Sequence, residues 1–93
     1  MHAAALLQTG IDFANEQGIE VRLELLDGSA SGLCVYGGKK RIFLDLSQNS
    51  LEQLHELGVA IIRDAGIGVV DLPSELRSAW GRLQPPVTTN RSL

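Results

Sequence analysis

Apolar side chains recur at the spacing of an amphipathic helix over residues 3–17. Gly18 follows this stretch as a helix stop, and the apolar stripe comprises Ala3, Leu6, Leu7, Ile11 and Ala14. Gly10 lies inside the stripe, where glycine costs about 1 kcal/mol relative to alanine. Either another backbone packs closely against Gly10 or the helix has a weak point there. The first element is predicted to be a helix in both cases.

Strict alternation of apolar and polar residues follows over residues 19–25. Four aliphatic side chains fall on one face, and Glu20, Arg22 and Glu24 fall on the other, which predicts a half-buried strand. Residues 27–32 are rich in Asp, Gly and Ser, as is typical of a loop. The length of this loop allows the first strand to pair with either of the next two strands.

Two further apolar runs, residues 33–36 and 42–46, flank residues 37–41 and predict a β-hairpin. In the second run, the side chains expected to face the core are those of Ile42, Leu44 and Leu46. Phe43 then faces outward, where a large apolar side chain is a candidate contact for a partner.

A second helix is predicted over residues 51–65, because the apolar residues cluster on one side of a helical wheel. Ser50 and Gln53 have the spacing of a capping box at its start, and Gly66 marks its end. After an extended segment, Pro73 suits the first position of a short third helix, whose apolar stripe comprises Leu76, Ala79, Trp80 and Leu83.

The predicted order is helix, three strands, helix and short helix. This order favours an α+β fold, in which a small three-stranded, mostly antiparallel sheet has helices packed on one face. Residues 1–84 are predicted to form a single domain, and residues 85–93 a flexible C-terminal tail.

The composition narrows the classes of protein. The 11 Asp and Glu outnumber the 8 Lys and Arg, so the basic surface that binds nucleic acid is not expected. Cys34 is the single cysteine and cannot form an internal disulfide, which is typical of a reducing, cytoplasmic compartment. The apolar runs are far shorter than the roughly 20 residues of a membrane span, so no membrane partner is expected.

Four short strings carry a family resemblance: Gly32–Cys34, Gly38–Arg41, Ile42–Asp45 and Asp71–Arg77. Together they resemble a family of small uncharacterised bacterial proteins from planctomycete and related genomes. That family has a Gly-Gly-x-Cys strand, a basic turn, a hydrophobic strand and a Leu-Pro-x-x-Leu-Arg ending. Ser31 stands here in place of the first glycine of the Gly-Gly pair. The resemblance implies an architecture and a bacterial origin, and it implies no activity.

His55 and Glu56 match the first two residues of the His-Glu-x-x-His motif on the helix of a zinc metallopeptidase. In that helix, two histidines four residues apart bind zinc and the intervening glutamate acts as general base. Val59 occupies the position of the second histidine and has no ligand atom. The string therefore indicates either a non-catalytic relative of a minimal metallopeptidase or a solvated helix face. No metal and no cofactor is predicted to bind.

Cys34 is a candidate catalytic thiol if His55 lies beside it, because a neighbouring imidazolium lowers the pKa of a thiol. Nothing in the spacing brings the two residues together, and a lone cysteine on a strand is more often a packing residue. Catalytic candidates are thus limited to Cys34, His55 and Glu56.

Gly37–Arg41 has the glycines and basic residues of a phosphate-binding loop. That mechanism needs a helix after the glycines, whereas a strand is predicted here. The stretch is therefore interpreted as a tight hairpin turn with a basic tip.

Arg77 and Trp80 on the last helix are candidate partner-binding residues, because Arg and Trp are enriched at interface hot spots. The alternative is that Trp80 packs in the core as part of the apolar stripe. The hypothesis that the sequence favours is a small protein-interaction or self-associating domain without catalytic activity. Such a domain would bind through a sheet edge or through Trp80.

Overall fold

The structure, a computed structural model, describes residues 2–83. Its elements are helix α1 (Ala3–Glu16), strands β1 (Ile19–Glu24), β2 (Gly32–Tyr36) and β3 (Lys39–Asp45), helix α2 (Ser50–Val59), a π-helical turn (Ala60–Asp64), a 3₁₀ turn (Val69–Asp71) and helix α3 (Ser74–Trp80). The α+β class and the expected order of helices and strands are confirmed. The tail expected at residues 85–93 lies outside the described residues.

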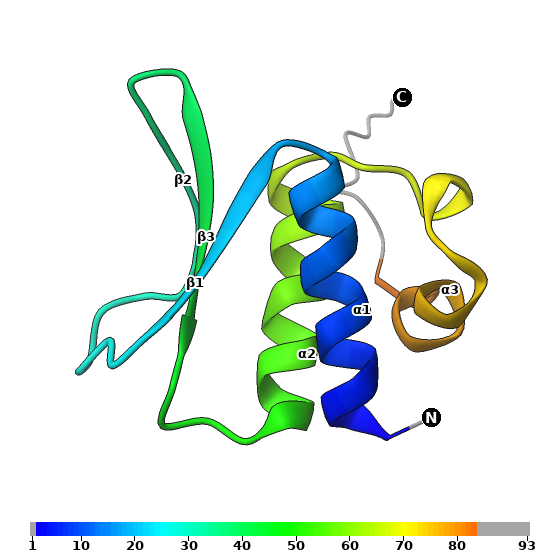
Figure 1. Cartoon of the computed structure of the whole chain (residues 1–93), viewed down its shortest axis with the longest axis horizontal. Helices are drawn as coiled ribbons and strands as arrows, with labels where there is room; N and C mark the ends of the chain where they lie inside the picture. The colour runs from blue at the N-terminus through cyan, green and yellow to red at the C-terminus, as the bar shows by residue number, and fades with distance from the viewer. Residues whose placement is uncertain (1, 84–93) are drawn as a thin grey trace, which may run out of the picture.

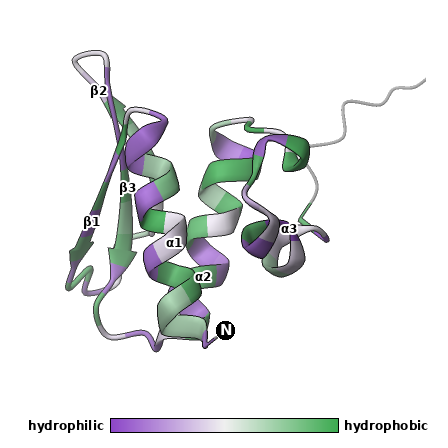
Figure 2. Cartoon of the chain, turned by 45° about the vertical axis from the view of Figure 1, so that its right-hand side comes forward, coloured by the Kyte–Doolittle hydropathy of each residue, from purple (hydrophilic) through white to green (hydrophobic). Residues whose placement is uncertain are grey.

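The elements form layers, with the sheet on one side, α1 and α2 in the middle and α3 beyond them (Figure 1). Apolar residues of α1 and α2 meet those of the sheet and of α3 in the interior (Figure 2). The helices α1 and α2 therefore cover one face of the sheet, as expected. The largest fully buried side chains are those of Trp80, Ile42, Leu44, Leu57, Ile61, Ile62 and Leu76.

The sheet is mixed, with the strand order β1-β3-β2. β1 runs parallel to β3, with Val21 opposite Ile42, whereas β2 runs antiparallel to β3, with Cys34 opposite Arg41. The expectation of a mostly antiparallel sheet was therefore wrong for one of the two pairings. β3 is the central strand, and its inward side chains Ile42 and Leu44 are fully buried. A strand in the middle of a sheet is buried more completely than the strands at its edges.

The apolar alternation continues past the ends of two strands. Leu25 and Leu46 were expected to face the core, but β1 ends at Glu24 and β3 at Asp45, and the two leucines are 72% and 53% exposed. The chain turns away from the sheet after β1, where Asp27 has a positive φ of 48°. The alternation of apolar and polar residues therefore predicts burial only within the strands and not for the residues that follow them.

Gly10 allows two side chains to approach the backbone of α1. A Cβ placed there would lie 2.9 Å from Cδ2 of Leu57 and 2.9 Å from Cη2 of Trp80. The expectation that another backbone packs against Gly10 was wrong, because the atoms that approach it closely belong to the side chains of Leu57 and Trp80. Glycine is needed here because α1 packs tightly against α2 and α3.

The capping box of α2 lies one residue earlier than expected. Asn49 Oδ1 accepts from the backbone N–H of Glu52 at 2.8 Å, and Glu52 Oε1 accepts from the N–H of Asn49 at 3.0 Å. Gln53 is buried instead, and its Nε2 donates to the carbonyl of Asp45 at 2.9 Å. Asn49 with Glu52 and Ser50 with Gln53 both have the spacing of a capping box. The first pair forms it because the side chain of Gln53 is buried and bonded elsewhere.

The helical segment that begins with α2 ends at Gly66, as expected. The π-helical turn is closed by the N–H of Ala65, which donates to the carbonyl of Ala60 at 2.8 Å, and Gly66 follows with a φ of +71°. Pro73 is the N-cap of α3 rather than its first helical residue.

Candidate functional site

A two-residue turn joins β2 to β3. Gly37 and Gly38 have φ of 58° and 78°, the conformation of a type I′ turn, and Tyr36 lies opposite Lys39 across it. The tight hairpin with a basic tip is thereby confirmed. The tip projects beyond the helical layer in Figures 1 and 2, so the end of β2 near the turn lacks helical cover.

β2 is an edge strand with no charged residue, since it reads Gly-Leu-Cys-Val-Tyr. Val35 is 61% exposed and Tyr36 is 82% exposed, and Cys34 between Leu33 and Val35 is exposed as well. Natural sheets usually protect an edge with charged residues or proline. Strand β2 has neither charged residues nor proline, and its side chains Val35 and Tyr36 are exposed to solvent.

The hairpin geometry fixes the direction of the backbone groups of β2. Residues that flank a two-residue turn form a hydrogen-bonded pair, so Tyr36 directs its N–H and C=O toward β3. The direction alternates along a strand, so Cys34 and Gly32 also face β3. Leu33 and Val35 therefore direct their backbone groups to the open edge.

The start of β2 is attached to α2. Ser31 Oγ donates to Oε1 of Glu56 at 2.8 Å. Gly32 follows with a φ of +129°, which only glycine adopts readily, and a Cβ there would lie 3.6 Å from Oδ2 of Asp64. Ser31 thus supplies a hydrogen bond that ties the start of the edge strand to the helix.

The outer face of the sheet carries a ladder of charges around Phe43. Glu20 Oε1 lies 2.7 Å from Nε of Arg41, and Arg22 lies 3.6 Å from Glu20 and 3.1 Å from Glu24. The hydrogen bond from Arg41 holds the pKa of Glu20 below its usual range. Phe43 is half-buried, with Arg22 opposite it on β1. Its outward placement is as expected, and its role as a partner contact stays a prediction.

Cys34 and His55 lie on opposite sides of the sheet. Cys34 shares the outer face with Arg41, because Ile42 and Leu33 alternate with them and contact the core. His55 belongs to α2, which covers the other face. The structure does not bring the thiol and the imidazole together.

Glu56 accepts the hydrogen bond from Ser31, so its carboxylate helps to hold the edge strand. Within residues 2–83, no group of three or more His, Cys, Asp or Glu side chains is arranged to hold a metal ion. Of the metallopeptidase string, only His55 and Glu56 are present, on one helix, and Glu56 has a structural partner.

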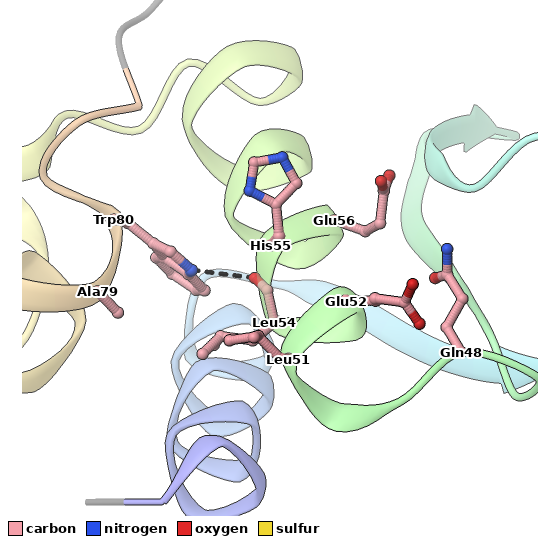
Figure 3. A pocket seen from close by; sticks show the side chains of 8 residues that line it. All are labelled: Gln48, Leu51, Glu52, Leu54, His55, Glu56, Ala79 and Trp80. Carbon is pink, nitrogen blue, oxygen red and sulfur yellow. Dashed lines mark hydrogen bonds between the residues drawn. The ribbon is translucent and has the colours of Figure 1, made fainter.

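A hollow of about 470 Å³ lies along α2 and reaches α3 (Figure 3), and its lining residues are Gln48, Leu51, Glu52, Leu54, His55, Glu56, Ala79 and Trp80. Trp80 donates from Nε1 to the carbonyl of Leu54 at 3.0 Å. Glu52 belongs to the capping box, and Glu56 binds Ser31. Trp80, Glu52 and Glu56 thus already serve the fold, whereas Gln48 Oε1 is buried without a hydrogen-bond partner among residues 2–83.

Trp80 is a core residue. It is 1% exposed and packs against Gly10 and Gly58, where a Cβ would lie 2.9 Å and 2.5 Å from its ring. The assignment of Trp80 to a partner surface was therefore wrong, and the alternative of core packing holds. Arg77 is exposed on α3, across the helical layer from Phe43, so these two candidates share no patch (Figure 1).

The residues that sequence reasoning missed are Ser31, Val35 and Tyr36. The signal that would have found the last two is the absence of charge in β2, immediately before two glycines. The contact of Ser31 with Glu56 has no such signal, because it joins residues 25 positions apart.

Comparisons with known proteins gave no significant match, whether with family models, with curated proteins or with solved structures. None of the helices within residues 2–83 has the length and apolar character that crossing a bilayer requires.

Proposed function

We propose that this chain is a self-associating interaction domain, in which β2 of one copy pairs with β2 of a second copy. The observation that carries the proposal is the open β2 edge, which is neutral and bears the exposed side chains of Val35 and Tyr36. Unpaired edges recruit a further strand through backbone hydrogen bonds, and adjacent side chains give specificity.

The charges at the two ends of β2 favour a second copy as the partner. Lys39 and Lys40 lie at the hairpin end and are exposed. Glu56 and Asp64 lie at the other end, next to Ser31 and Gly32. Antiparallel pairing of two β2 strands brings the basic end of each copy near the acidic end of the other, which steers association and opposes the parallel arrangement.

This function needs no catalytic group. The thiol hypothesis lacks a base, because the sheet separates Cys34 from His55. The metallopeptidase relationship stays a prediction, and the partner role of Phe43 and Arg77 stays one as well.

A light-scattering series from micromolar to millimolar protein tests the proposal. We expect the mass to rise from one chain to two, and Val35→Lys to keep the protein monomeric, because the added ammonium must be desolvated in the paired edge. Val70→Lys is the matched control, since Val70 is 80% exposed on the 3₁₀ turn. A monomer at every concentration would overturn the proposal, as would equal effects of the two substitutions.

A further inference from the structure

We infer that the two β2 strands pair in a single register, which places Cys34 opposite Cys34 of the second copy. The inference rests on the proposed self-association and adds the register, the contacts and a redox response. It follows from the backbone of β2, from its side chains and from the position of its cysteine.

The backbone permits few registers. Only Leu33 and Val35 direct their N–H and C=O groups to the open edge, so these residues must form the hydrogen-bonded pairs of any antiparallel dimer. When Leu33 lies opposite Val35 of the second copy, the symmetry of the dimer creates the same pair twice. All five residues of β2 are then paired, with Cys34 on the two-fold axis.

The two other symmetric registers use less of the strand. Centring the pair on Leu33 or on Val35 keeps only three residues of β2 opposite β2, because the strand ends at Gly32 and Tyr36. The remaining residues then face the loop or the glycine turn of the second copy. The register centred on Cys34 therefore makes the most backbone hydrogen bonds between regular strands.

Side chains favour the same register. Tyr36, 82% exposed, comes to lie opposite Gly32 of the second copy, where no side chain competes for the space. An aromatic ring over a cross-strand glycine is a stabilising pair in antiparallel sheets. On the other face, Val35 meets Leu33 of the second copy, so two aliphatic side chains cover each other.

The central pair is not hydrogen-bonded, and facing Cα atoms in such pairs are about 4.5 Å apart, within the roughly 4.4–6.8 Å that a disulfide spans. Oxidised glutathione can therefore convert the dimer into a covalent one. The two Cys34 thiols lose two protons and two electrons and form one S–S bond. The glutathione disulfide accepts them and leaves as two reduced thiols.

The test compares three proteins that each hold one cysteine: the unchanged chain, Cys34→Ser with Leu33→Cys, and Cys34→Ser with Val35→Cys. They are treated with oxidised glutathione and resolved without reductant. We expect the unchanged chain to cross-link at least about tenfold faster than the other two at a protein concentration at which light scattering shows the dimer, because pairing holds only the Cys34 thiols face to face, at millimolar effective concentration. We also expect an equal mixture of the two variants to give the mixed dimer.

Preferential cross-linking through position 33 or position 35 alone would overturn the register. So would equal rates in all three proteins, or a rate for the unchanged chain that urea does not lower. Light scattering under reducing conditions separates the two proposals. A dimer without rapid Cys34 cross-linking rejects the register and leaves self-association standing, whereas a monomer rejects both.

Discussion

Strands β1 and β2 form the two edges of one sheet, and β3 lies between them. The outward side chains of β1 are Glu20, Arg22 and Glu24, linked to one another and to Arg41 by ion pairs. β2 has no charged residue, and its half near the turn extends beyond the helices. Both edges offer backbone groups to an incoming strand, so the side chains decide which edge a partner selects.

Cover by the helices strengthens the difference. Val21 and Leu23 of β1 are partly buried and pack against the core, whereas Val35 and Tyr36 of β2 are mostly exposed. A strand added to β1 would have to desolvate the charge ladder. A strand added to β2 would cover apolar surface, which is favourable.

The largest effect is expected from Val35→Pro. Because the N–H of Val35 points to the open edge, proline removes a hydrogen bond between copies and none within the hairpin. Two such bonds and their covering contacts are lost per dimer, roughly 3 kcal/mol, which weakens association about a hundredfold or more. Sedimentation equilibrium measures the change.

Val35→Thr is the control for that experiment, since it keeps both the branched side chain and the N–H. It should retain most of the association. Circular dichroism should show both variants folded. Dimers of normal stability from folded Val35→Pro would show that the β2 edge is not the contact.

A smaller effect is expected when β1 is made to resemble β2. Changing Glu20, Arg22 and Glu24 together to Thr removes the charge ladder and keeps strand propensity. Each molecule then has two open edges, so we expect assemblies larger than the dimer in light scattering, growing with concentration. The matched control changes Glu16, Glu75 and Arg82 to Thr, which are exposed and lie outside the sheet. Larger assemblies from the control, or none from the β1 variant, would contradict the role of the ladder.

The sequence predicted the strands that form the two edges of the sheet, but it did not predict which strands would be the edges. The helices, the hairpin and the outward position of Phe43 follow from local periodicity and turn chemistry, and the structure agrees. The strand order does not follow, because the loop after β1 permits pairing with β2 or with β3. The structure places β3 in the centre of the sheet, where Ile42 and Leu44 are fully buried and the strand contacts α2.

The candidate site shows the same limit. Trp80 has the spacing of both a core residue and a hot spot, and its place against Gly10 and Gly58 is a contact between distant segments. Cys34 and His55 are chemically suited to each other, yet the alternation of β2 turns the thiol away from α2. Residue type suggests chemistry, whereas long-range packing decides which groups meet.

Tyr36→Ala should weaken association less than Val35→Pro does. It removes the ring from two symmetric cross-strand pairs, each contributing about 0.2–1 kcal/mol, so the dissociation constant should rise roughly two- to thirtyfold. Leu51→Ala is the control, because Leu51 is 66% exposed on α2 and lies away from the edge. If Leu51→Ala weakens the dimer and Tyr36→Ala does not, the contact lies along α2 instead.

The smallest effect is expected on the pH dependence of folding stability, to which the charge ladder of β1 contributes. Arg41 lowers the pKa of Glu20 chiefly by its hydrogen bond, and the N–H of Ser47 lowers that of Asp45 chiefly by another. The folded chain thus binds fewer protons than the unfolded one near the ordinary carboxyl range. The stabilisation is fully present above the unfolded pKa values and is lost as the pH falls through the folded ones.

Urea unfolding of the monomeric Val35→Pro chain from pH 7 into that acid range measures this loss without interference from association. Glu20→Gln should lower stability slightly at neutral pH and flatten the acid profile. Asp45→Asn should remove a further part of the decrease in stability with falling pH, and the double variant should show the smallest decrease. Both carboxylates are solvent-exposed, so salt should screen the Glu20 ion pair more than the short Asp45 turn. An acid profile that Glu20→Gln leaves unchanged would mean that the ladder serves only to keep other strands from β1, without stabilising the fold that carries it.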